Sequence, residues 1–274
     1  MDHARCAELP DLALDPVRPL AERLKSLVAS VPGERCVLKL IVTRGLSARG
    51  YRPPVDAAPN WTASLTLAPD APADAHARGV AVTYCRTRVS REDHRLVGIK
   101  HLNRLPQVLA RSEWQDEYHD GIMFGCDGMV IEGTASNIFL VKDDRLSTPD
   151  LSLCGVHGIM RRRVIDHAVR TGIPMDIVQV ELPQLEAADE IFLTNSVFGI
   201  VPVGRIDSRA YRVGPMTQAA LKRFQRAKGL EASGELDAAT AARLSGLMGS
   251  ETPSTATRRS SRAISTGVVA SSAR

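Results

Sequence analysis

A chain of 274 residues with 44% hydrophobic residues and mixed charges is typical of a soluble globular protein that can bury a sizeable core. Its net charge of +4 is small for this length and is as compatible with an anionic small molecule as with a nucleic acid, so we expect no nucleic-acid partner. No apolar run reaches the roughly 18 residues of a membrane helix, and the first residues do not form a signal peptide, so we expect a cytoplasmic protein without membrane contact.

The first third of the chain predicts one helix and three strands. Apolar residues at helical spacing predict a helix over residues 15–30, and a run rich in β-branched residues predicts a strand over 36–42. Glycine and proline residues then indicate a loop as far as Pro54. Two further strands are expected near 62–68 and 79–89, with a polar connection between them.

The middle of the chain alternates helices and strands. A helix is expected over residues 104–117, and Asp127-Gly128 between two apolar runs predicts a hairpin in which both turn residues have positive φ. A helix over 157–171 is expected to end at Gly172, a plausible C-cap. Further strands are expected over 136–141, 175–180, 190–194 and 200–206. The pattern indicates an α+β fold with mostly antiparallel neighbours.

The composition changes near residue 214. Two helices are expected over 217–227 and 237–248, and the tail from 250 onward, rich in Ser, Thr, Ala and Arg, is expected to be disordered. The five cysteines are odd in number, widely spaced and not arranged as a metal pair. We therefore expect reduced, mostly buried thiols and no metal site.

Three separate segments carry the residues that predict chemistry: Gly98–Leu105, Glu132–Asn137 and Gly155–Arg161. An isolated lysine or glutamate in such a place is usually a solvated side chain, so the argument depends on the combination. A pyridoxal-phosphate enzyme needs an amine for the cofactor aldehyde, a carboxylate at the pyridine nitrogen and backbone donors at a helix start for the phosphate. Lys100, Glu132 and the loop at 155–158 can supply these three groups.

The order and spacing of these segments resemble the fold-type IV pyridoxal-phosphate enzymes, the class IV aminotransferases. Three stretches, residues 98–111, residues 42–51 and residues 156–161, look specifically like aminodeoxychorismate lyase. The resemblance covers about residues 5–213 and implies a two-lobed α+β fold, with pyridoxal 5'-phosphate between the lobes of a homodimer. It also implies conversion of 4-amino-4-deoxychorismate to 4-aminobenzoate and pyruvate in folate synthesis. An aminotransferase acting on D- or branched-chain amino acids is the alternative, with the same cofactor.

The resemblance implies a role for each of several residues. Lys100 would carry the cofactor and act as the catalytic base, and Glu132 would contact the pyridine nitrogen. The other cofactor contacts would come from Asn137, Gly158, Ile159, Met160, Thr194 and Asn195. Arg44 and Arg49 would bind the carboxylates of the substrate, because a guanidinium matches that geometry. His101, next to the lysine, is expected to be structural.

The sequence departs from the family at both ends. The family's N-terminal Asp-Arg-Gly and His-x-x-Arg-Leu segments have no counterpart here, which implies a truncated N-terminal lobe. Because the arginine of the second segment binds the cofactor phosphate in the family, we expect weak cofactor binding and poor turnover. An inactive remnant that acts only as an interaction protein is the second alternative. Residues 214–244 resemble half of a peptidoglycan-binding module, and we favour a two-helix appendage there, since two helices alone bury little surface.

These observations predict four parts in the chain. They are a partial N-terminal small lobe at 1–90, a cofactor-binding large lobe at 91–213, a helical appendage at 214–249 and a disordered tail at 250–274.

Overall fold

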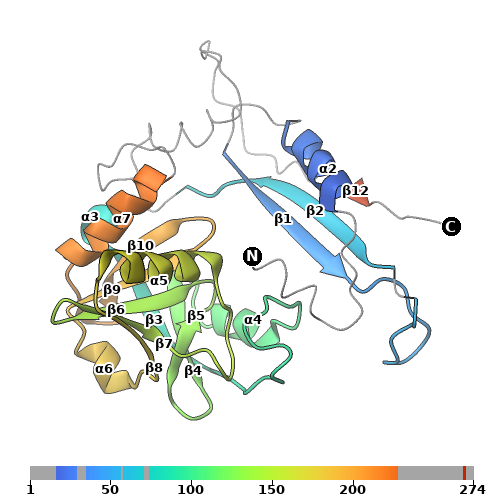
Figure 1. Ribbon diagram of the computed structural model, residues 1–274. Coiled ribbons are helices and arrows are strands. Elements are labelled where there is room, and N and C mark those ends of the chain that lie inside the picture. The colour runs from blue at the N-terminus through green and yellow to red at the C-terminus, as the bar shows by residue number, and fades with distance from the viewer. Residues whose placement is uncertain (1–16, 30–34, 57, 71–73, 228–267, 270–274) are drawn as a thin grey trace. The chain divides into compact units, whose positions relative to one another are not determined.

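The computed structural model describes residues 17–29, 35–56, 58–70, 74–227 and 268–269 (Figure 1). The predicted helix at 237–248 and most of the predicted tail lie outside these residues. The chain divides into two compact units. The first comprises residues 1–70 and 237–274, and the second comprises residues 71–236.

The first unit contains a helix and a small antiparallel sheet. Helix α2 spans Val17–Ala29, and strands β1 (Cys36–Thr43), β2 (Asn60–Leu67) and β12 (Val268–Val269) are hydrogen-bonded in the order β1-β2-β12. The helix and both long strands were predicted. Ala63 and Leu65 are the buried side chains of β2, and the guanidinium of Arg23 lies 5.8 Å from the centre of the Trp61 ring.

The second unit is built on a nine-stranded sheet in the order β5-β4-β3-β10-β9-β6-β7-β8, with β11 paired to β10. The Val130 N–H donates to the Val180 carbonyl at 2.8 Å. This bond links the β5 edge to the chain that leaves β8, so the sheet curls on itself. The strands are β3 (Val80–Val89), β4 (Asp120–Gly125), β5 (Val130–Gly133), β6 (Asn137–Lys142), β7 (Arg145–Pro149), β8 (Met175–Val178), β9 (Glu190–Asn195), β10 (Gly199–Ile206) and β11 (Arg209–Ala210).

Helices α5 and α7 pack on this sheet, as Figure 1 shows. Phe139 of β6 and Phe192 of β9 stack with ring centres 5.0 Å apart, and α5 packs over them through Met160. Leu221 of α7 is fully buried in the same cluster. The helices of the second unit are α3 (Ala75–Arg78), α4 (Leu105–Arg111), α5 (Ile159–Thr171), α6 (Leu182–Glu186) and α7 (Pro215–Ala227).

The start of α7 is fixed by a buried carboxylate. Glu190 of β9 accepts hydrogen bonds from the N–H groups of Met216 and Thr217, at 3.3 and 2.8 Å. These N–H groups belong to the first turn of the helix and have no acceptor within it. Helix α7 is therefore anchored to the middle of the sheet as well as packed against it.

The structure corrects the predicted boundary at residue 90. Strand β3 was assigned to the first lobe, but it pairs in parallel with β4 and β10 inside the second unit. The sequence shows that a strand is present but does not show which strands it pairs with. The prediction of mostly antiparallel neighbours holds, although β3–β4, β3–β10 and β7–β8 are parallel.

The predicted hairpin exists between β4 and β5, but its turn differs from the prediction. Only Gly128 has positive φ, at 83°, while Asp127 does not. The Gly128 N–H donates to the Gly125 carbonyl, and the Gly125 N–H donates to the Met129 carbonyl. This is the pattern of a type I turn followed by a bulge at glycine, which needs one residue of positive φ rather than two. The turn with two such residues joins β6 to β7, at Asp143 and Asp144.

Candidate functional site

A buried carboxylate lies at the centre of the candidate site. Glu132, on β5, is only 4% exposed. Its Oε2 accepts hydrogen bonds from the Val156 N–H at 2.9 Å and from Asn137 Nδ2 at 3.3 Å, and neither bond uses Oε1. Burial raises the pKa of Glu132 to about 7, although the bond from Val156 and the charges of Arg104 and Lys100 act in the opposite direction. This carboxyl group is therefore sensitive to any positive charge placed beside it.

Asn137 connects this carboxylate to the start of helix α5. Its Nδ2 also donates to the Val156 carbonyl at 2.8 Å. A Cβ atom on Gly158 would lie 2.1 Å from Asn137 Oδ1, so only glycine fits at that position. The absence of a side chain at Gly158 allows the first residue of β6 to approach the N-cap of α5.

The start of α5 presents donors without acceptors. Gly158 is the N-cap and makes no side-chain capping bond. The N–H groups of Ile159 and Met160 have no acceptor within the helix, and the helix dipole favours an anion near them. This end of the helix is therefore suited to bind an anionic group.

Thr194 adds a hydroxyl on the same side of the sheet. It pairs with Asn137 across β6 and β9, so the two side chains project from the same face. Thr194 is 1% exposed, and its Oγ1 has no hydrogen-bond partner among the described residues. Because a buried hydroxyl without a partner is costly, this atom is suited to a polar ligand.

The loop that carries Lys100 is tied to the loop before α5. The Gly98 N–H donates to the Gly155 carbonyl at 3.1 Å, and the His157 N–H donates to the Gly98 carbonyl at 3.0 Å. Gly98 has a φ of +78°, and a Cβ there would meet the His157 ring at 2.6 Å. The Lys100 side chain is exposed. The bonds of its loop hold it close enough to Glu132 for its positive charge to lower the pKa of that carboxyl group.

The other side of the lysine loop is held by polar side chains. Arg104 donates to the carbonyls of Ile99 and His101, and Glu92 Oε1 lies 3.0 Å from His101 Nε2. His101 is therefore part of the loop's support, as predicted for a structural histidine.

The structure brings together Lys100, Glu132, Asn137, Gly158, Ile159, Met160 and Thr194 through the contacts above. None of these contacts involves Asn195. Its Oδ1 accepts hydrogen bonds from the N–H groups of Val197 and Phe198, which close the turn after β9. Arg44 and Arg49 lie in the first unit. The predicted roles of all these residues at a cofactor or substrate stay predictions.

The sequence did not single out Asp120, at the start of β4. Its carboxylate is 5% exposed and accepts bonds from Thr134 and Ser136, in the turn between Glu132 and Asn137. The only signal in the sequence was the pair of hydroxyl residues in that turn, which need an acceptor once buried.

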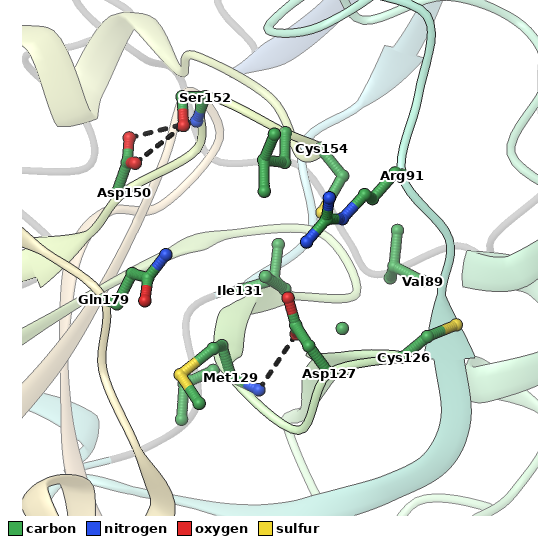
Figure 2. Close-up of a pocket in the computed structure, with 13 residues that line it drawn as sticks. Val89, Arg91, Cys126, Asp127, Met129, Ile131, Asp150, Ser152, Cys154 and Gln179 are labelled. Carbon is green, nitrogen blue, oxygen red and sulfur yellow. Dashed lines mark hydrogen bonds between the residues drawn. The ribbon is translucent and has the colours of Figure 1, made fainter.

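A separate small pocket lies beside β5 (Figure 2). Ile131 and Cys154 line it, and these are the neighbours in sequence of Glu132 and Gly155. The two carboxylates in this pocket bind backbone or side-chain groups of their own loops. Asp127 accepts a hydrogen bond from the Met129 N–H, and Asp150 accepts hydrogen bonds from the N–H and the hydroxyl of Ser152. None of the predicted site residues lines this pocket, so it is distinct from the candidate site.

Among the described residues, no helix is long and apolar enough to cross a membrane. In the same part of the chain, no group of three or more His, Cys, Asp or Glu residues could hold a metal ion.

Comparison with known families gives two matches. The family described as amino-transferase class IV matches residues 12–206. The family described as a putative peptidoglycan binding domain matches residues 204–244. The second match begins inside β10 and includes α7, so the described part of it belongs to the second unit's own sheet and core.

Individual relatives agree with the first match. Aminodeoxychorismate lyase of Vibrio harveyi is 35% identical over 184 residues, which are 67% of this chain and 68% of that protein. A probable branched-chain-amino-acid aminotransferase of Thermotoga maritima is 39% identical, but over 130 residues, which are 46% of this chain and 47% of that protein. The crystal structure of 4-amino-4-deoxychorismate lyase from Pseudomonas aeruginosa has 40% identity and a TM-score of 0.74, covering 81% of this chain and 80% of that one. The predicted fold-type IV architecture is confirmed, and the chain belongs to the class IV aminotransferase family.

Proposed function

We propose that the protein is a pyridoxal-phosphate-dependent aminodeoxychorismate lyase. It would convert 4-amino-4-deoxychorismate to 4-aminobenzoate and pyruvate in folate biosynthesis. The support for a lyase is that similarity to two such enzymes extends over two thirds or more of the chain. Two aminotransferases match a similar share of the chain, 69% and 73% of it, but their identity is 32% and 30%, below the 35% and 40% of the two lyases.

The observation that carries this proposal is the position of Glu132. It is a buried carboxylate beside the start of α5, and both of its hydrogen bonds use the same oxygen. The other oxygen can face a protonated ring nitrogen, whose positive charge would favour the ionised carboxylate. The phosphate would then be bound by the N–H groups of Ile159 and Met160 and by the hydroxyl of Thr194, which otherwise has no partner in the described chain. These residues fit the cofactor.

The remaining chemistry comes from Lys100 and two arginines. When bound, pyridoxal phosphate supplies a ring that accepts electrons. The Lys100 amine would hold the aldehyde carbon of the cofactor and, once freed by the substrate amine, would take the proton from the substrate ring at Nζ. Glu132 would keep the ring nitrogen protonated. Arg44 and Arg49 would bind the substrate carboxylates, since each guanidinium can donate two parallel hydrogen bonds to a carboxylate.

The products test this proposal. Incubation of the purified chain with pyridoxal phosphate and 4-amino-4-deoxychorismate should release 4-aminobenzoate and pyruvate in equal amounts, without 2-oxoglutarate. Lys100→Ala is the control for non-enzymatic breakdown. The aminotransferase alternative would be supported instead by consumption of 2-oxoglutarate with a D- or branched-chain amino acid and no release of 4-aminobenzoate.

We also propose that the enzyme is a cytoplasmic homodimer. Four aliphatic residues on and before α4 are more than half exposed, and together we call them the α4 patch: Leu102, Leu105, Val108 and Leu109. An exposed group of neighbouring aliphatic side chains is typical of a surface that another protein covers. The patch lies next to Lys100, so a second copy bound there would also shield the catalytic loop from water. The cytoplasmic location is supported by the cysteine spacing, which indicates no disulfide framework.

We expect the wild-type chain to elute at twice its mass in size-exclusion chromatography with light scattering. The double variant Leu105→Lys with Leu109→Lys should elute as a monomer, because two charges would have to be buried without partners. Val169→Lys, which changes an even more exposed aliphatic residue on α5, should leave the dimer intact. A monomeric wild type, or a dimeric double variant, would show that the α4 patch has another purpose.

A further inference from the structure

Asp120 accepts four hydrogen bonds, three of them from one short turn at residues 134–136. Its Oδ1 accepts the Thr134 N–H at 2.9 Å, the Thr134 hydroxyl at 2.5 Å and the N–H of its own neighbour Gly121 at 2.8 Å. Its Oδ2 accepts the Ser136 hydroxyl at 2.7 Å. These donors are hydroxyls and backbone N–H groups, which together offset the cost of burying the carboxylate.

The turn that Asp120 holds joins two residues of the candidate site. Residues 134–136 connect β5, which carries Glu132, to β6, which begins at Asn137. Two backbone bonds tighten this connection, from the Thr134 N–H to the Gly121 carbonyl at 3.0 Å and from the Gly133 N–H to the Ser136 carbonyl at 2.7 Å. The separation of Glu132 and Asn137 therefore depends on the conformation of a turn that Asp120 fixes.

The packing around this turn leaves little space for another arrangement. A Cβ atom on Gly133 would lie 2.3 Å from Ser136 Oγ and 2.6 Å from Asp120 Oδ2. On the other side of the turn, Asn137 Nδ2 reaches both Glu132 Oε2 and the Val156 carbonyl, so a shift of the turn would alter both contacts. Misplacement by about 1 Å can cost roughly 10²-fold in rate when reacting groups are held in a fixed geometry.

We propose that Asp120 is a positioning residue that sets the alignment of Glu132 and Asn137 through the turn at 134–136. The proposal rests on the proposed role of Glu132 beside the cofactor ring. Asp120 does not contact the cofactor in this scheme, and it acts only through the turn. It would therefore affect the rate of the chemical step more than the binding of the substrate.

The test compares Asp120→Asn with a matched control, Glu113→Gln. Glu113 is also a carboxylate that accepts hydrogen bonds from two backbone N–H groups, of Arg86 and Thr87, and from the Thr87 hydroxyl. These bonds lie at the irregular part of β3 and not at the turn of the candidate site. Both variants should lower the melting temperature of the full chain. Asp120→Asn should lower kcat about 10²-fold with little change in KM, whereas Glu113→Gln should leave both constants unchanged. Equal kinetic losses in the two variants would mean that Asp120 acts only on stability, and the proposal would be wrong.

A double-mutant cycle with Glu132→Gln tests the path of the effect. If Asp120 acts through Glu132, Asp120→Asn should have almost no further effect on kcat in the Glu132→Gln background, since effects along one path do not add. Additive losses in kcat would overturn the proposal. Crystal structures of the cofactor-free variants give an independent measure. Asp120→Asn should displace residues 134–136 and break the contact between Asn137 and Glu132, whereas Glu113→Gln should not.

These measurements separate the two proposals. If Glu132→Gln alone leaves turnover unchanged, the proposed role of Glu132 fails, and the displacement of the turn in the crystal structures then decides the role of Asp120. An undisturbed turn in Asp120→Asn would refute the positioning role, whatever the kinetics show.

Discussion

Lys100→Ala should lower turnover by at least about 10⁴-fold, the upper end of what a single general base contributes. The loss should be this large because the variant removes both the amine that holds the cofactor and the base that takes the substrate proton. The fold should be unaffected, since the Lys100 side chain is exposed and its loop is held by backbone bonds between Gly98, Gly155 and His157. The melting temperature without cofactor should therefore match that of the wild type.

Chemical labelling checks the same assignment independently of activity. Borohydride reduction of the wild type with pyridoxal phosphate, followed by peptide mapping, should place the pyridoxyl group on Lys100. Lys142→Ala, which removes an exposed lysine paired with Asp189, is the control and should be labelled as the wild type is. A label on any other lysine would contradict the assignment.

Glu132→Gln should retain covalently attached cofactor but lose turnover by about 10²- to 10³-fold, the scale for one preorganised electrostatic contact. Glutamine preserves the shape of the side chain and can still accept the Val156 N–H, but it carries no charge to stabilise a protonated ring nitrogen. Turnover of the reconstituted variant is the measurement. If turnover were unchanged, the carboxylate would have no electrostatic role.

Glu132→Gln should lower turnover, but above pH 7 it should raise the stability of the cofactor-free protein. Burial raises the pKa of Glu132 to about 7. Between the ordinary pKa of a carboxyl group and pH 7, the folded protein therefore keeps Glu132 protonated, whereas the unfolded chain has released that proton. The stability associated with the neutral carboxyl is present at low pH and is lost as the pH rises through about 7. Above that pH the buried charge costs roughly 3 kcal/mol. The variant should therefore melt higher than the wild type at pH 8 to 9 and similarly near pH 4.

Glu113→Gln should change the melting temperature in the opposite direction to Glu132→Gln. Burial acts to raise the pKa of Glu113, but hydrogen bonds from the Thr87 hydroxyl and from the Arg86 and Thr87 backbones hold it below the usual value. Its contribution to stability is present at neutral pH and is lost on acidification. This variant should therefore melt lower than the wild type at neutral pH, with a smaller difference in acid. If both variants shifted the melting curve in the same direction at pH 8, the assignment of a neutralising buried site to Glu132 would be wrong.

The sequence singled out the residues of the candidate site that lie in local motifs. Glu132, Asn137 and the loop before α5 lie in short segments whose residue types carry the chemistry, and the structure brings them together. Asp120 could not be predicted, because its contact with Thr134 depends on how β4 and β5 pair across the hairpin. The same limit explains the boundary at residue 90, since the partners of β3 come from residues far along the chain.

Short elements were missed for a different reason. Strand β7 contains Arg145, Ser147 and Thr148, and helix α6 has only five residues, so neither produces a clear hydrophobic period. The hairpin at Asp127-Gly128 was predicted correctly as a hairpin, but its turn is a type I turn with a bulge at Gly128, which has one residue of positive φ rather than the two expected of Asp-Gly.

The central position of β10 bears on how this chain could be divided. A cut at the start of the peptidoglycan-binding match, residue 204, would split β10, which lies between β3 and β9 in the sheet. The upstream fragment would lose the part of β10 that pairs with β3 at Arg205 and Ile206, together with Leu221 from its core. The downstream fragment would carry a helix whose first turn has lost its acceptor, Glu190. The described part of the second match therefore belongs to the same compact unit as residues 71–206 of the first match, and it is not a module that could be exchanged between proteins without rebuilding that unit.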